Sequence, residues 1–234
     1  MSDPADRGDV SPEAIREFRE LVASLPADDD AEAWAAREAV ARAAAAADVR
    51  RSLEQRGRLL VEKGFPLAAL DDALSPELDM ACPPLARVAR WNPGEHPLLA
   101  LAGSTGIGKT VAAAWWALHC RVPGMRFVRA TTFARLRGRA HQELLDAGAL
   151  VLDDLGEEPL DRAGIVLANL GELVDVFYQA RKPLLVTSNL RDVDFAERYG
   201  ERIASRWRQR GRWAEFGGAP SRRPPPTERQ RSLV

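Results

Sequence analysis

The sequence predicts an α/β domain with a parallel sheet, preceded by a helical N-terminal arm. Three observations favour this fold class. Short apolar segments with the character of strands alternate with segments of helical spacing, as in repeated βα units. A glycine-rich segment lies between the first strand and the helix that follows it. The length of 234 residues suffices for one full α/β domain and a smaller element.

The arm is expected to cover residues 1–65. Ser11 and Pro12 have the character of a helix start, with an N-cap followed by Pro at the first helical position. A second, Ala-rich helix is expected from about Ala31 towards Lys63. Its apolar face is thin, because most of its members are Ala. We interpret the arm as a docking element for a partner; an N-terminal extension without a docking role is the alternative.

The compact domain is expected over residues 66–218, and the Arg- and Pro-rich segment 219–234 is expected to be disordered. A helix is expected at 171–180. Four segments have the character of strands and a fifth is a candidate for a short closing strand: 98–102, 125–130, 150–153, 183–188 and 212–216.

The glycine-rich segment reads Gly-Ser-Thr-Gly-Ile-Gly-Lys-Thr and matches the P-loop pattern G-x-x-x-x-G-K-[ST] at every fixed position. Lys109 is expected to reach the phosphates as a point charge, and the Thr110 hydroxyl to bind Mg²⁺. We therefore expect ATP and Mg²⁺ as cofactors, since the Asn-Lys-x-Asp motif of GTPases is missing from the sequence. The expected nucleotide contacts are Gly103, Ser104, Thr105, Gly106, Ile107, Gly108, Lys109, Thr110 and Val111.

An apolar strand ends in two adjacent carboxylates, Asp153 and Asp154. At the carboxyl end of a strand beside the P-loop, Asp153 is expected to hold Mg²⁺ through water. Asp154 is then placed to orient or polarise the attacking water. Glu157 is expected either to assist it or to cap the next turn.

Three further residues suit nucleotide hydrolysis. Asn189 ends the next strand and can hydrogen-bond the γ-phosphate or the attacking water, although Asn at a strand end is also common in simple turns. Arg202 and Arg206 lie four apart on a predicted helix and share a face. One of them is expected to reach the γ-phosphate of a neighbouring subunit as an arginine finger; the alternative is a solvated helix surface.

These motifs, in this order and within this length, resemble the DnaC/IstB-like branch of the AAA+ ATPases. The resemblance covers about residues 64–218. It implies a P-loop NTPase (AAA+) core with a five-stranded parallel sheet. It also implies that Asp154 is the catalytic acid, Asn189 the first sensor and Arg206 the arginine finger, with Arg202 in reserve.

The resemblance further implies that elements between the P-loop and the Asp pair bind single-stranded DNA. Phe127 and Phe133 lie near basic residues there, and this mixture suits a phosphate track with stacking surfaces. A basic amphipathic helix with Phe127 in the core is the alternative. The expected DNA contacts are Arg129, Arg135, Arg137 and Arg139.

The expected function is that of a helicase-loader-like ATPase, slow on its own, that acts as a homo-oligomer with a replicative helicase. A transposition helper with the same ATPase and a transposase as partner is the nearest alternative. A P-loop nucleotide or small-molecule kinase is a remote one, because the Asp pair followed by Thr-Ser-Asn speaks against it. An adaptor that binds ATP only as a switch is a fourth interpretation.

The net charge of −1 conceals an asymmetry. Residues 1–80 carry 10 basic and 18 acidic side chains, whereas residues 201–234 carry 9 Arg and 3 Glu. Two faces with different partners are therefore expected, the basic one facing nucleic acid; a solvated acidic helix and a basic tail without a partner are the alternative. The two cysteines, Cys82 and Cys120, have no metal-binding spacing. With no signal peptide and no apolar run of membrane-spanning length, a cytoplasmic location without a membrane partner is expected.

Overall fold

The computed structural model describes residues 16–17, 20, 31–161 and 164–217. The chain divides into two compact units, residues 1–56 and 57–234. The helix start expected at Ser11 and the tail expected at 219–234 lie outside the described residues.

The described part of the first unit contains most of helix α2 (Ala31–Glu62), which confirms the predicted Ala-rich helix. Ala has the highest helix propensity of all residues, so a long Ala-rich segment favours this conformation. Ion pairs one turn apart support it on the surface, with 3.4 Å between Glu38 and Arg42 and 3.0 Å between Arg50 and Glu54. Trp34 is 65% exposed, so a large apolar side chain of this helix faces solvent.

The last turns of α2, from Gly57 onward, belong to the second unit. Leu60 is buried there, and the ring of Phe65 packs 4.9 Å from that of Phe127. The Phe127 N–H donates a hydrogen bond to the Lys63 carbonyl over 3.0 Å. These contacts fix the point at which the chain enters the sheet-containing unit.

The second unit is built on a parallel sheet in the order β2-β3-β4-β1-β5. The described strands are β1 (Leu98–Gly103), β2 (Met125–Arg129), β3 (Ala149–Leu155), β4 (Leu184–Ser188) and β5 (Gly211–Phe216). All five predicted strand segments are therefore confirmed. The described helices after α2 are α3 (Leu67–Leu74), α4 (Pro83–Ala89), α5 (Lys109–His119), α6 (Ala130–Phe133), α7 (Arg139–Leu145), α8 (Ile165–Ala180), α9 (Asp192–Tyr199) and α10 (Glu201–Arg210).

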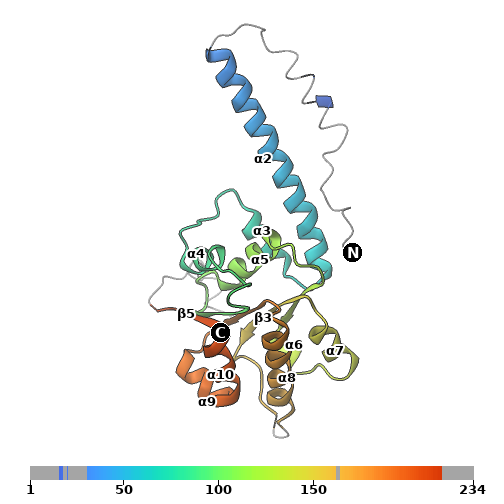
Figure 1. Ribbon diagram of the computed structural model, residues 1–234, viewed down its shortest axis with the longest axis vertical. Helices are drawn as coiled ribbons and strands as arrows, with labels where there is room; N and C mark the ends of the chain where they lie inside the picture. Colours follow the sequence, from blue (N-terminus) through green and yellow to red (C-terminus); the bar gives the residue numbers. More distant parts are fainter. Residues whose placement is uncertain (1–15, 18–19, 21–30, 162–163, 218–234) are drawn as a thin grey trace, which may run out of the picture. The chain divides into compact units, whose positions relative to one another are not determined.

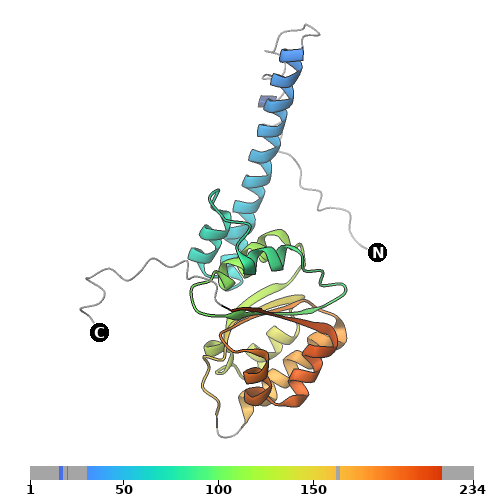
Figure 2. The same cartoon turned by 90° about the vertical axis from the view of Figure 1, so that its left-hand side faces the viewer.

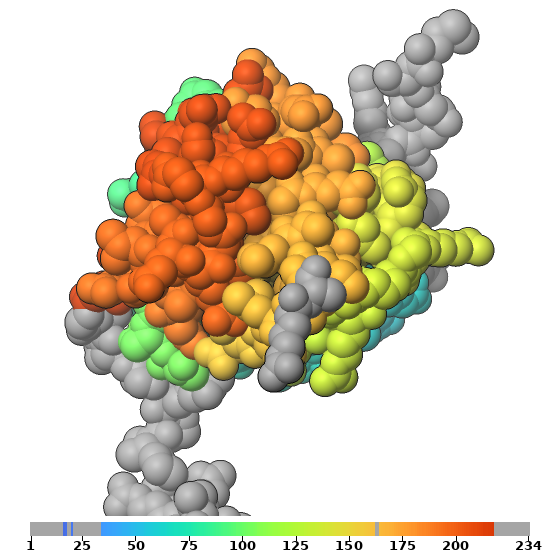
Figure 3. Space-filling view, turned by 90° about the horizontal axis from the view of Figure 1, so that it is seen from below, coloured from blue at the N-terminus to red at the C-terminus, as the bar shows by residue number. Residues whose placement is uncertain are grey.

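Helices cover both faces of this sheet. Helices α3, α4 and α5 lie on one face, and α8, α9 and α10 lie on the other (Figures 1 and 2). Figure 3 shows the second face, where α9 and α10 (orange to red) lie beside α8 (light orange), which in turn borders α7 (yellow-green). Because both faces are covered, the inner strands β1, β3 and β4 are buried along nearly their whole length, as expected of a parallel sheet.

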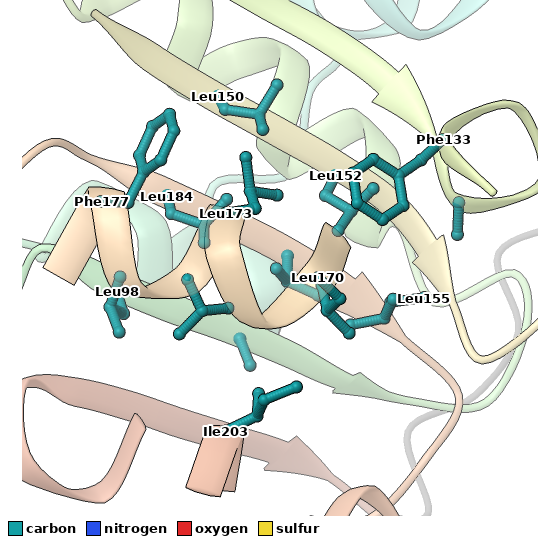
Figure 4. Close-up of a cluster of buried hydrophobic side chains, with 14 of the residues drawn as sticks. Leu98, Phe133, Leu150, Leu152, Leu155, Leu170, Leu173, Phe177, Leu184 and Ile203 are labelled. Carbon is teal, nitrogen blue, oxygen red and sulfur yellow. The ribbon is translucent and has the colours of Figure 1, made fainter. Parts of the chain in front are cut away.

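The core between the sheet and α8 fixes the strands relative to one another. Leu98, Leu150 and Leu184 come from three adjacent strands and are fully buried. Leu173 and Phe177 of α8 pack against them from the helix side (Figure 4). Burial of such side chains contributes about 1.5–3 kcal/mol each relative to an exposed position. The rigid sheet that results holds the polar residues at its carboxyl edge in place.

Strand β3 extends beyond its predicted end, since it runs to Leu155 and includes both aspartates. The register of β3 against β4 shifts between Leu152 and Leu155, which accommodates Asp154. No helix among the described residues is long and apolar enough to cross a membrane.

Candidate functional site

A pocket of about 870 Å³ opens at the carboxyl edge of the sheet. Its volume lies within the range of about 300–1,000 Å³ found for small-molecule sites. One wall comes from the P-loop and the tips of the strands, and the other comes from α3 and the turn after it. The lining residues are Pro66, Ala68, Ala69, Asp72, Ser75, Glu77, Leu78, Thr105, Gly106, Gly108, Lys109, Thr110, Val111, Arg129, Thr131, Asp153, Asp154, Glu157 and Asn189.

The P-loop has the backbone geometry of a phosphate cradle. Gly103, Gly106 and Gly108 have φ values of 153°, 88° and 93°, which side chains with a Cβ rarely adopt. A Cβ on Gly103 would also lie 2.8 Å from the Cδ1 of Ile107. Helix α5 begins at Lys109, directly after the loop, and the N-terminus of a helix favours an anionic ligand. The loop therefore fits a phosphate chain.

Most of the predicted nucleotide contacts share this pocket. Gly103 and Ser104 do not line it, but their carbonyl groups accept hydrogen bonds from Lys109. Ile107 also lies outside the lining; its side chain is 2% exposed and its carbonyl accepts a contact from the Cys82 thiol at 3.4 Å. The others line the pocket: Thr105, Gly106, Gly108, Lys109, Thr110 and Val111.

Lys109 connects the P-loop to the tip of β4. Its ammonium donates to the carbonyl groups of Gly103 at 2.7 Å and Ser104 at 3.0 Å, and to the side-chain oxygen of Asn189 at 2.9 Å. The residue is only 6% exposed, so this positive charge is largely removed from bulk water. A bound phosphate would meet a cation that is already held at the base of the cradle.

Asp153 accepts hydrogen bonds from two threonines on different elements. The Thr110 hydroxyl donates to Oδ1 over 3.0 Å and the Thr187 hydroxyl donates to the same oxygen over 2.7 Å. Burial raises the pKa of the Asp153 carboxyl above its ordinary value, and the negative charge of Asp154 adds to this rise. The two hydrogen bonds and the positive charge of Arg129 lower the pKa but do not cancel the rise. A cation at this carboxylate would relieve the cost of burying it.

The donor set of Thr110 and Asp153 fits Mg²⁺. A hydroxyl and a carboxylate are hard oxygen ligands, and Mg²⁺ typically takes one or two of these from protein and completes its shell with phosphate and water. Within the described part of the chain, no cluster of three or more His, Cys, Asp or Glu side chains forms a separate metal cage. The arrangement therefore suits an ion that binds together with a nucleotide.

Asp154 adopts a left-handed conformation, with a φ of 57°. Its N–H donates to the Thr187 hydroxyl over 2.8 Å, and its side chain lines the pocket. Few non-glycine residues occupy this region unless the surroundings enforce it, and such residues cluster at functional sites. Thr187 thus holds both aspartates, accepting from the backbone of one and donating to the side chain of the other.

Glu157 and Asn189 meet at the rim of the same pocket. The Asn189 amide donates to Glu157 Oε1 over 3.0 Å while its oxygen accepts from Lys109. The structure therefore brings Glu157 to Asn189, and both residues line the pocket that contains Lys109.

Behind this rim, a buried carboxylate anchors the loop that follows the aspartates. Glu158 is 1% exposed and accepts from the Gly156 N–H at 2.8 Å and from the Tyr199 hydroxyl. Arg198 contacts its carboxylate at 3.4 Å. Burial, together with the hydrogen bond to Glu158 and the negative charge of Glu158, raises the pKa of Tyr199 above its ordinary value. The cluster ties the loop of Asp154 to α9.

Arg202 and Arg206 do not line the pocket of their own chain. Both lie on α10 and pair with Asp175 of α8, at 2.6 Å and 2.9 Å.

The four predicted DNA-binding arginines fall into two groups. Arg129 ends β2 directly opposite Asp153 and lines the nucleotide pocket. Arg135, Arg137 and Arg139 are exposed and lie outside this lining, the last paired with Glu143 at 3.2 Å.

The predicted stacking surface is wrong in this structure. Phe127 and Phe133 are 8% and 1% exposed, because one faces the core from β2 and the other from α6. Neither offers a ring face to a base. The burial of Phe127 expected in the alternative interpretation is confirmed, but its basic amphipathic helix is not found, since Arg135 and Arg137 lie between α6 and α7.

Three parts of the site were not predicted from the sequence: the α3 wall, Thr187 as a bridge between the aspartates, and the buried Glu158. The Thr-Ser-Asn motif carried a signal for Thr187, because a hydroxyl on a strand that is buried along its whole length needs a hydrogen-bond partner. No local pattern marks α3, since its place beside the P-loop follows from tertiary packing.

The sheet order and the P-loop between β1 and α5 define the fold of an AAA+ P-loop NTPase domain, with the Asp pair near the carboxyl end of β3, which β4 separates from β1. Comparison with protein-family models and with curated proteins gives no match. Solved structures do resemble the chain. DnaI gives a TM-score of 0.52 at 23% identity, covering 68% of this chain and 94% of that chain.

Two further solved structures are similar with lower scores. The DnaC helicase loader gives a TM-score of 0.46 at 23% identity, over 56% of this chain and 84% of that chain. Domain III of the Thermotoga maritima replication initiation protein DnaA gives 0.46 at 19% identity, over 68% of this chain and 67% of that chain. The likeness to DnaI supports the resemblance to the DnaC-like AAA+ ATPases at the level of the fold, and the predicted fold class is confirmed.

Proposed function

We propose that this protein binds and hydrolyses ATP and acts as an accessory factor of DNA replication, resembling helicase loaders. The observation that carries the proposal is the single pocket in which Lys109, Asp153, Asp154 and Asn189 converge. These four residues come from three separate strand–loop segments, and folding alone does not require their polar side chains to line one cavity. Together they match the groups that in-line attack of water on a γ-phosphate requires.

Each residue has a distinct role in the proposed reaction. The P-loop amides and Lys109 hold the phosphates, and Thr110 and Asp153 would hold Mg²⁺, which would offset charge on the β- and γ-phosphates. Asp154 accepts a proton from, or orients, the attacking water. Asn189 contacts the γ-phosphate or that water, with Glu157 holding its amide. The α3 wall of the pocket would then enclose the base.

Completion of the site requires a neighbour. Arg206 lies outside the pocket of its own chain, and an added cation near the γ-phosphate would stabilise charge that develops in the transition state. We therefore propose a homo-oligomer in which Arg206 of one copy reaches the nucleotide of the next, with Arg202 as the reserve candidate. A lone subunit is then a slow ATPase.

Residues 1–65 are proposed as the docking arm for the replicative helicase, residues 66–218 as the ATPase domain and residues 219–234 as a basic tail. Exposed Trp34 supports the docking role, because an apolar ring on a solvated helix is available to a partner. Single-stranded DNA is proposed to bind along Arg135, Arg137 and Arg139, with Arg129 nearer to the nucleotide.

The nearest alternative is a transposition helper with the same ATPase and a transposase in place of the helicase. A P-loop kinase remains a remote alternative, and Asp154 beside Asn189 favours attack by water instead. An affinity capture in ATP and Mg²⁺ from lysate of the protein's own source separates the first two. Enrichment of the replicative helicase by the wild type, and its loss with Lys109→Ala, supports the loader. Enrichment of a transposase supports the alternative, and enrichment of neither contradicts both roles.

A further inference from the structure

Arg206 is held from two directions by its own chain. Its Nε donates to Asp175 Oδ1 over 2.9 Å, and its guanidinium carbon lies 5.1 Å from the centre of the Tyr178 ring. Asp175 and Tyr178 are three residues apart on α8, so they present their side chains on one face of that helix. Helix α10 packs against α8 on this face of the sheet, where the two helices lie side by side (Figure 3).

The bond to Asp175 occupies the inner nitrogen of Arg206. Among the described residues, no hydrogen-bond partner is found for its two terminal nitrogens. Arg202 differs, since one of its terminal nitrogens donates to Asp175 Oδ2 over 2.6 Å and its side chain is 77% exposed. A guanidinium fixed through Nε presents a planar pair of donors, which matches two oxygens of a phosphate. The geometry favours Arg206 over Arg202 as the group that meets an anion.

The ring of Tyr178 is itself fixed. Its hydroxyl donates to Gln209 over 2.7 Å, and the guanidinium carbon of Arg210 lies 4.9 Å from the same ring centre. Stacking on an aromatic ring restricts a guanidinium without consuming its donors. Tyr178 therefore limits the rotation of Arg206 while leaving its terminal nitrogens available.

The cluster also keeps an excess of positive charge. The carboxylate of Asp175 pairs with the guanidinium groups of Arg202 and Arg206, and the guanidinium of Arg210 lies over the neighbouring Tyr178 ring. Partial burial disfavours ionisation of Asp175, but the hydrogen bonds from Arg206 and then Arg202 outweigh it and hold its pKa below the ordinary value. A single carboxylate can thus orient the arginines without neutralising them, so the surface still attracts an anion.

We propose that Asp175 and Tyr178 are positioning residues that preset the Arg206 guanidinium for the terminal phosphate of ATP bound to a second copy of this chain. The inference rests on the proposed function, because it assumes that Arg206 acts between subunits. Its physical basis is preorganisation: donors that are already oriented need not be ordered when the transition state forms.

The test compares kcat and KM for ATP, and the dependence of the rate on protein concentration, in full-length variants. Asp175→Asn and Tyr178→Ala are each expected to lower kcat by about 10-fold, with KM and the Kd for a fluorescent ATP analogue within about 2-fold of wild type. Tyr178→Phe keeps the ring and is expected to keep kcat within about 2-fold. Glu201→Gln, which removes the carboxylate partner of Arg208 on the same helix, is the matched control and is expected to have the wild-type kcat.

A mixing experiment separates positioning between subunits from damage within one subunit. Asp175→Asn subunits are mixed with Asp154→Asn subunits, which carry an intact Arg206 but a disabled site. The mixture is expected to hydrolyse ATP several-fold faster than the sum of its parts, because each intact site then faces an intact arginine. Mixing with the Asp154→Asn/Asp175→Asn double variant is expected to give no gain.

The Arg206→Ala variant separates the proposed arginine finger from the proposed positioning role of Asp175 and Tyr178. If Arg206→Ala keeps the wild-type kcat, the arginine finger of the proposed function is wrong, and the inference falls with it. If Arg206→Ala loses hydrolysis while Asp175→Asn and Tyr178→Ala keep the wild-type kcat, only the positioning role is wrong. The positioning role would also be wrong if Asp175→Asn lost ATP hydrolysis and mixing with Asp154→Asn restored none of it. The defect would then be confined to the subunit that carries the substitution.

Discussion

The ammonium of Lys109 and the side-chain oxygen of Asn189 lie 2.9 Å apart, although 80 positions separate the two residues in the chain. The contact joins the P-loop to the tip of β4 at the place proposed for the γ-phosphate. A phosphate that binds Lys109 would take over part of this interaction and so become adjacent to Asn189. The pair therefore offers a direct way for the end of β4 to respond to the nucleotide.

Asn189→Ala is expected to lower kcat for ATP hydrolysis by about 10- to 100-fold, since it removes a polar group that would act on developing charge or on the attacking water. The Kd for ATP is expected to change by less than about 3-fold, because the P-loop and Lys109 provide most of the phosphate binding. Steady-state kinetics and nucleotide titration measure the two effects. Weaker ATP binding with an unchanged kcat would show that Asn189 has no part in the chemical step.

Thr187→Val is expected to destabilise the protein by about 1–3 kcal/mol, because it removes the acceptor of the Asp154 N–H and one of the two hydroxyl donors to Asp153. The variant keeps the size and branching of the side chain, so the packing is little changed. Half-saturation of the ATPase by Mg²⁺ is expected to need a higher concentration, since Asp153 loses a group that orients it. Thr132→Val at an exposed site is the control and is expected to stay within about 0.5 kcal/mol of wild type in urea unfolding. A Thr187→Val protein with the stability and Mg²⁺ dependence of this control would contradict the bridge.

Glu157 and Glu158 are adjacent, but replacing them by Ala is expected to affect different properties, stability for Glu158 and the rate of hydrolysis for Glu157. Glu158→Ala is expected to destabilise the nucleotide-free protein by about 2–4 kcal/mol, because it leaves the Tyr199 hydroxyl and the Gly156 N–H without their acceptor and removes the carboxylate that faces Arg198. Glu157→Ala, at an exposed position, is expected to change stability by less than about 0.5 kcal/mol and to lower kcat through its contact with Asn189. Denaturant unfolding of both variants checks the contrast, and equal stabilities would refute the anchoring role of Glu158.

Binding of single-stranded DNA is expected to weaken about equally for all sequences when Arg135 and Arg139 are replaced by Ala, because contacts with phosphates carry no sequence information. The slope of log Kd against log salt is expected to fall by about 1–2, in line with about 0.7 per lost contact on single strands. Fluorescence anisotropy with labelled oligonucleotides at several salt concentrations measures this. An unchanged slope would place the DNA contacts elsewhere or exclude them.

The strands and the P-loop could be predicted from sequence because their signals are local. Buried parallel strands are short apolar runs, and the phosphate cradle needs glycines and a lysine at fixed spacing. The order of the strands could not be predicted in this way, since it depends on which apolar faces pack together. The last two residues of β3, Asp154 and Leu155, were also missed, because a charged residue such as Asp154 is rare in strands and suggests a turn.

The site was predicted where chemistry requires particular residue types and missed where packing decides. Lys109, Asp153 and Asn189 followed from motifs, and the structure brings them into one pocket. The wall formed by α3 carries no such signal, and its residues are ordinary for a short helix. Phe127 was wrongly expected at a DNA surface, because alternation along β2 puts it in the core although basic residues flank it.

The central claim is that this pocket hydrolyses ATP through Asp154 once Lys109 has bound the phosphates. The most direct test measures ATP binding and phosphate release by the full-length wild type, Lys109→Ala and Asp154→Asn, at high protein concentration with Mg²⁺. The account predicts that the wild type binds and hydrolyses, that Lys109→Ala loses both, and that Asp154→Asn binds ATP but releases phosphate at least about 100-fold more slowly. Hydrolysis by Asp154→Asn at the wild-type rate, or a wild type that does not bind ATP, would contradict it.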